Sequence, residues 1–122
     1  MTGPDLAERA RRGGAALWTA VLVGIVAWMA HLTADASLVR LACGHNSWDL
    51  ALHAVTALTA VATGAGLVVC ANLARAAGDD EGAGTVAGRT RFVSLFGVLV
   101  NATSLALILL EGSYVLFIKP CA

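Results

Sequence analysis

Three long, mostly apolar stretches cover most of the chain, and short polar segments separate them. They extend over residues 14–32, 48–73 and 92–118. Each reaches or approaches the ~20 apolar residues that an α-helix needs to cross a bilayer. Because lipid offers no hydrogen bonds to an open backbone, helices are the form expected for such runs. The pattern predicts an all-α fold, an integral membrane three-helix bundle that forms one domain over residues 1–122.

Small and polar residues recur on one helical face of each stretch, at i, i+3, i+4 and i+7 spacing. Helices in lipid associate through small residues and interhelical hydrogen bonds, so we expect these faces to meet in the bundle centre. In the first stretch the expected face is Ala16, Ala20, Gly24, Ala27 and His31, with Trp28 beside them. In the second it is His53, Thr56, Thr63 and Cys70. In the third it is Ser94, Gly97, Asn101, Ser104 and Glu111. Among them, the polar residues expected to hold the helices together are Asn101, Ser104, Thr56 and Thr63.

Basic residues are divided unevenly between the two sides of the bundle. The N-terminal segment carries three arginines, and so does the second connecting segment, about residues 74–91. The first connecting segment has only Arg40 and the C-terminal segment only Lys119. The positive-inside rule therefore places the N-terminus inside and the C-terminus outside. We expect a multi-pass protein of a bacterial inner (plasma) membrane.

The first apolar stretch also has features of a signal peptide. Arg11 and Arg12 precede it, and Ala34-Asp35-Ala36 has the form of a cleavage site. However, the apolar run exceeds the ~7–15 residues of a signal-peptide core, and it ends with Trp28 and His31. These features favour a retained span, with cleavage as the alternative.

Composition argues against several functional classes. Apolar residues make up 58% of the chain and charged residues 13%, with eight basic and eight acidic side chains. Nucleic-acid binding is not expected, because such proteins carry clustered basic residues. No common nucleophile, phosphate-loop or zinc-protease motif is present, so we do not expect an enzyme. The expected partners are the lipid bilayer and either other membrane subunits or further copies of the chain, because so small a bundle buries little surface.

Two of the three cysteines are expected on the outer side. Cys43 lies in the first connecting segment and Cys121 is next to last in the chain. Disulfides persist on an oxidising face, so we predict a Cys43–Cys121 bond. The alternatives are a copper-type site that includes His45, or two unlinked thiols. Cys70, in the second stretch, is interpreted as a small buried side chain.

Three ionisable residues, His31, His53 and Glu111, fall in the outer part of the expected bundle. Ionisable groups in lipid are costly and usually face the interior with partners. The preferred interpretation is structural, with paired groups that fix the helix register and no cofactor. The alternatives are a metal ion or haem held by these residues, and proton transfer.

The order of several short motifs carries a resemblance. The motifs are Trp28-x-x-His31-Leu32, Arg40-x-x-Cys43, Leu52-His53-x-x-Thr56, Arg91-Phe92, Gly97, Asn101, Glu111 and Lys119-Pro120-Cys121. From Trp28 onwards the chain resembles a group of small three-span bacterial membrane proteins encoded near haem-copper terminal oxidases. The resemblance implies a respiratory neighbourhood and no catalytic residue. The expected function is a non-enzymatic accessory or assembly subunit of a respiratory oxidase. A metal- or haem-binding membrane protein and a small proton- or ion-conducting oligomer are the alternatives.

Overall fold

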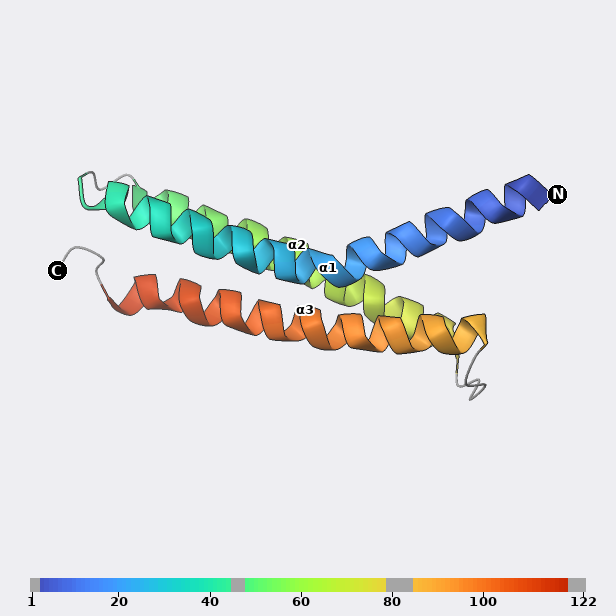
Figure 1. Cartoon of the computed structure of the whole chain (residues 1–122). Coiled ribbons are helices and arrows are strands. Elements are labelled where there is room, and N and C mark those ends of the chain that lie inside the picture. Colours follow the sequence, from blue (N-terminus) through green and yellow to red (C-terminus); the bar gives the residue numbers. More distant parts are fainter. Residues whose placement is uncertain (1–2, 45–47, 79–84, 119–122) are drawn as a thin grey trace.

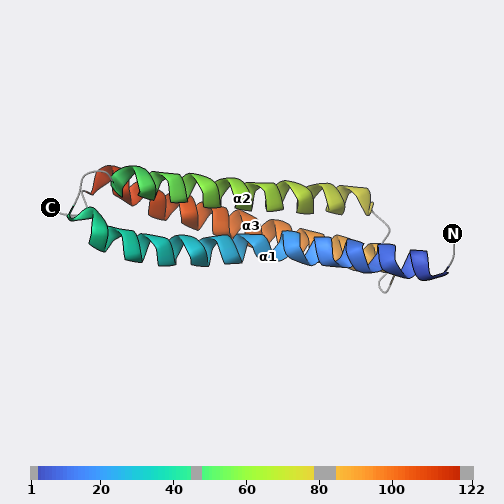
Figure 2. The same ribbon diagram turned by 90° about the horizontal axis from the view of Figure 1, so that it is seen from above.

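The chain folds into three long helices that run alternately up and down. The computed structural model describes residues 3–44, 48–78 and 85–118. Within these ranges α1 covers Gly3–Ala42, α2 Trp48–Ala76 and α3 Val86–Phe117, and each packs against both others (Figures 1 and 2). All three are long and apolar enough to cross a membrane. The prediction of an all-α, three-helix membrane bundle is confirmed.

The helices are longer than the apolar stretches that predicted them. The 40 residues of α1 correspond to about 60 Å, twice the thickness of a hydrocarbon core of about 30 Å. A loop was expected from Thr33, but α1 continues to Ala42. The hydroxyls of Thr33 and Ser37 donate to Met29 O and Thr33 O, at 2.9 and 2.8 Å, so their polar groups are satisfied inside the helix. Hydropathy therefore marks the expected edge of the bilayer and not the end of the helix.

The first part of α1 leaves the bundle. Figure 1 shows its N-terminal turns diverging from α2 and α3, and residues 9–16 are exposed. The expectation that Ala16 belongs to the central face is therefore wrong. Glu8 forms ion pairs along this arm with Arg11 at 3.0 Å and Arg12 at 2.9 Å. These are i,i+3 and i,i+4 pairs, which add a few tenths of a kcal/mol each, about 0.2–0.5, to an exposed helix.

The bundle centre is built from small and polar side chains. On α3 the buried residues follow helical spacing and are Ser94, Gly97, Asn101, Ser104, Ile108 and Gly112. On α2 they are Leu52, Thr63, Gly66, Cys70 and Ala74. Apart from buried residues such as Leu52 and Ile108, many large apolar side chains point outward, as Leu58, Val61 and Leu99 do. This is the arrangement expected where the surroundings are lipid and close backbone approach holds the helices together.

Asn101 of α3 contacts both other helices, and its side chain is fully buried. Its Nδ2 donates to Ala20 O of α1 at 2.9 Å and to Gly97 O of its own helix at 2.8 Å. A Cβ on Gly24 would lie 2.6 Å from Asn101 Oδ1, and one on Gly66 2.8 Å from the same atom. Both glycines are therefore needed for α1 and α2 to approach the amide. We call Ala20, Gly24, Gly66, Gly97 and Asn101 the Asn101 junction.

Both helix ends that flank the second connecting segment have defined caps. Gly78 follows α2 with φ 70°, a left-handed conformation that glycine adopts without a Cβ penalty, and its N–H donates to Arg75 O at 3.2 Å. Thr85 caps α3, because its hydroxyl accepts from the Gly88 N–H at 3.0 Å. Ser47, which directly precedes α2, lies outside the described residues.

Two glycines of α2 provide a test of the junction. In Gly66→Ala the new methyl would contact the Val23 side chain and lie 3.0 Å from Ala20 O, which is backbone and cannot move away alone. We expect a loss of about 1–3 kcal/mol in unfolding free energy, the usual cost of overpacking. The measurement is circular dichroism during unfolding of the purified protein in detergent.

Gly64 is the matched control, because a Cβ there meets nothing within 4 Å. Gly64→Ala should be neutral or stabilising by up to ~1 kcal/mol, since alanine has the higher helix propensity. Equal stability of the two variants would show that the junction does not hold the bundle together.

Candidate functional site

The polar groups of the bundle gather at the end where α1 finishes, α2 begins and α3 finishes. Trp28, His31 and Asp35 come from α1, at i, i+3 and i+7, where successive side chains are three and four residues apart and share one helix face. Thr56 comes from α2 and Glu111 from α3. We call these five residues the His31 cluster.

His31 is the centre of the cluster and its side chain is fully buried. Its Nε2 lies 3.0 Å from Thr56 Oγ1. Its Nδ1 lies 3.4 Å from Asp35 Oδ2 and 3.4 Å from Glu111 Oε2. The indole N–H of Trp28 donates to the other Glu111 oxygen, also at 3.4 Å. Each of the three helices therefore supplies a polar contact to this one point.

The hydrogen-bond roles around the imidazole leave Nδ1 facing two carboxylates. The Thr56 hydroxyl donates to Leu52 O at 3.1 Å, so its oxygen accepts from Nε2–H of His31. Nδ1 then faces one oxygen of Asp35 and one of Glu111. Neither Nδ1 nor this Glu111 oxygen has a hydrogen-bond partner within the described part of the chain.

A glycine sets the close packing of α2 and α3 beside the cluster. A Cβ on Gly112 would contact Thr56 Cγ2 and lie 3.0 Å from Thr56 Oγ1. Since Gly112 follows Glu111 directly, the same close approach places both Thr56 and Glu111 against His31. The sequence-level interpretation missed Gly112, although its spacing of four from Ile108 and of eleven from Asn101 continues the buried face of α3.

The predicted group of His31, His53 and Glu111 is only partly brought together. His31 and Glu111 meet, whereas the side chain of His53 is exposed. In the ranges that the structure describes, no three His, Cys, Asp or Glu side chains are placed to hold a metal ion. The third ionisable side chain beside His31 and Glu111 is Asp35, and not the predicted His53. From the sequence it was considered only within a cleavage motif, although its i,i+4 spacing from His31 was a signal for pairing.

The cysteines differ in their surroundings. Cys70 is a free, buried cysteine that packs with Ala20 and Val21, as expected for a small core side chain. Cys43, in the turn after α1, takes part in an interaction and is not free. Cys121 and His45 lie outside the described residues, so the Cys43–Cys121 disulfide stays a prediction.

No protein family, curated protein or solved structure matches this chain. Its class is therefore defined by the fold and the site alone. The chain is a multi-pass helical membrane protein, and near one end of the bundle a buried histidine lies beside two carboxylates.

Thr56→Val tests the role of Thr56 in the cluster. Valine keeps the shape of threonine but removes the oxygen that accepts from His31 Nε2, so a buried donor loses its partner. Hydrogen bonds between membrane helices contribute about 0.6 kcal/mol on average and at most about 1.7. We therefore expect unfolding in detergent to become easier by about 1 kcal/mol.

Thr59→Val is the control, because the Thr59 hydroxyl donates only to Val55 O and Thr56 O of its own helix. It should change the unfolding free energy by a few tenths of a kcal/mol at most, roughly the scale of surface substitutions. If both variants unfold alike, the contact between Thr56 and His31 contributes nothing to stability.

Proposed function

We propose that the chain is a non-enzymatic accessory subunit of a respiratory complex in the bacterial inner membrane. Its N-terminus lies on the cytoplasmic side of that membrane. The Asn101 junction is the observation that supports this role. The bundle centre is closed there by the amide of Asn101 against Gly24 and Gly66, so it holds neither a pore nor a ligand chamber at that level. A bundle with a closed centre can contact other molecules through its outer surface and its two ends. An accessory subunit binds its neighbours through the same surfaces.

The outer surface suits this role. Between 17% and 28% of the residues in each apolar window are buried within the bundle, so most of every span faces outward. That surface carries large apolar side chains such as Leu58, Val61 and Phe96, which pack equally well against lipid or against a neighbouring helix. The motif order from Trp28 onwards supports the respiratory assignment, because it resembles proteins encoded beside haem-copper oxidases.

Affinity purification from native membranes in a mild detergent tests the accessory role. A tag at the N-terminus leaves the His31 cluster untouched, because Trp28, His31 and Asp35 lie in the C-terminal part of the 40-residue α1. We expect haem-copper oxidase subunits to co-purify and to migrate with the chain on native gels. A tagged, unrelated three-span protein from the same membranes controls for detergent carry-over. Migration of the chain alone or only with its own copies contradicts the proposal.

The His31 cluster favours a second candidate, in which the subunit takes up and releases a proton. Two carboxylates lie 3.4 Å from Nδ1 of His31, and both are partly exposed, Asp35 at 21% and Glu111 at 31%. Protons can therefore reach the cluster from its own end of the bundle. The Asn101 junction closes the way towards the other end. The proton would return to the same side or pass to a neighbouring subunit, so a conducting oligomer would need a path between bundles.

Infrared spectroscopy across a pH series tests proton sharing directly. We expect the carboxyl bands of the wild-type protein to change on titration, and Glu111→Gln, Asp35→Asn and His31→Gln each to alter that change. Removing one group changes where the shared proton resides for the other two. His53→Gln is the control, since this exposed histidine lies outside the cluster. A titration that none of the three cluster variants alters rules out the shared proton.

A further inference from the structure

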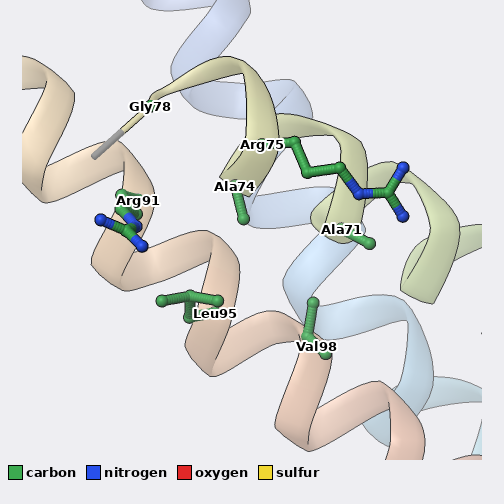
Figure 3. Close-up of a pocket in the computed structure, with 7 residues that line it drawn as sticks. All are labelled: Ala71, Ala74, Arg75, Gly78, Arg91, Leu95 and Val98. Carbon is green, nitrogen blue, oxygen red and sulfur yellow. The ribbon is translucent and has the colours of Figure 1, made fainter. Parts of the chain in front are cut away.

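The opposite end of the bundle carries a groove between the last turns of α2 and the first turns of α3. Its volume is about 450 Å³, within the range of roughly 300–1,000 Å³ that is common for ligand sites. Figure 3 shows Ala74 and Leu95 between two arginines, Arg75 and Arg91, whose side chains extend in opposite directions. Ala71 and Val98 form the part of the wall nearest the Asn101 junction.

The lining changes from charged to apolar with depth in the membrane. Arg91 and Val98 are seven residues apart on α3, which corresponds to about 10 Å along the helix. Val98 is three residues from Asn101, which lies in the middle of α3. The apolar part of the groove thus points towards the bilayer centre and the arginines towards the membrane surface. A phospholipid has the same order, with its phosphate at the surface and its acyl chains below.

The N-terminal part of α1 leaves this end of the bundle. The N-terminal turns of α1 diverge from α2 and α3 (Figure 1), and residues 9–16 are exposed. No residue of α1 lines the groove near Arg75 and Arg91 in the described part of the chain. Acidic residues follow at positions 79–81, after α2 has ended.

We propose that this groove binds one anionic phospholipid, with its phosphate at the arginine-bearing end of the groove and an acyl chain along Leu95 and Val98. The Arg75 guanidinium donates one bond to Asn72 Oδ1 at 3.3 Å, and Arg91 also has a contact. A guanidinium has five N–H donors, so each can keep this contact and still bind phosphate. Basic pockets between membrane helices bind anionic head groups through the same contacts.

Native mass spectrometry in a neutral detergent tests the site with phosphatidylglycerol and phosphatidylcholine as probes. The wild-type protein should bind phosphatidylglycerol preferentially, as a single adduct. Arg75→Gln/Arg91→Gln should weaken this binding by about 30-fold, from the usual contribution of two basic residues at a membrane surface. Arg75→Lys/Arg91→Lys should retain most of the preference, because the charge remains. Circular dichroism of each variant shows whether the helices are intact.

Arg9→Gln/Arg12→Gln is the matched control, since it removes two charges from the same end of the bundle but outside the groove. It should leave the adduct in place. The proposal is overturned if this control loses the adduct as completely as the groove variant, because attraction would then be general. It is also overturned if the groove variant keeps the preference, or if inorganic phosphate at equal concentration displaces the lipid.

Discussion

Lipid removes the main force that packs helices in water, and the whole structure depends on what replaces it. Apolar side chains gain little by leaving lipid tails for one another, so close backbone contact and polar bonds must hold the helices together. The Asn101 junction provides both at one level. Its amide bonds to Ala20 O and Gly97 O, and only glycine at positions 24 and 66 allows α1 and α2 to come this near. Large side chains are left to face the lipid.

The junction also divides the bundle into two chemically different ends. On one side lies the His31 cluster, where carboxylates from α1 and α3 converge on a buried imidazole. On the other side the arginines of α2 and α3 border an open groove. Side chains and backbone of all three helices pack closely at the junction, so it separates the two ends within the bundle. Each end therefore meets the solvent, lipid or protein on its own side of the membrane.

Much of this arrangement follows from periodicity, and the remainder follows from contacts between helices. The positions of Gly24, Thr63, Gly97 and Asn101 on inward faces were predictable, since a single helix determines which residues share a face. The divergence of the N-terminal part of α1 was not predictable from its sequence, because it depends on how α1 packs against α2 and α3. For a similar reason the sequence predicted His53 beside His31, whereas the structure places Asp35 there and leaves His53 exposed. A helix pattern fixes the angular position of a side chain, but its neighbours depend on the rotation and depth of the other two helices.

The placement of the two carboxylates has a consequence for the role of the bundle. If the cluster served only to fix helix register, complete pairing of its buried polar atoms would be its most stable form, because an unpaired buried polar group costs free energy. Instead Asp35 and Glu111 remain partly exposed, while an oxygen of each is buried without a bond, as is Nδ1 of His31. Such incomplete pairing costs stability, and a register lock gains nothing from it. It suits a group whose proton must exchange with its surroundings.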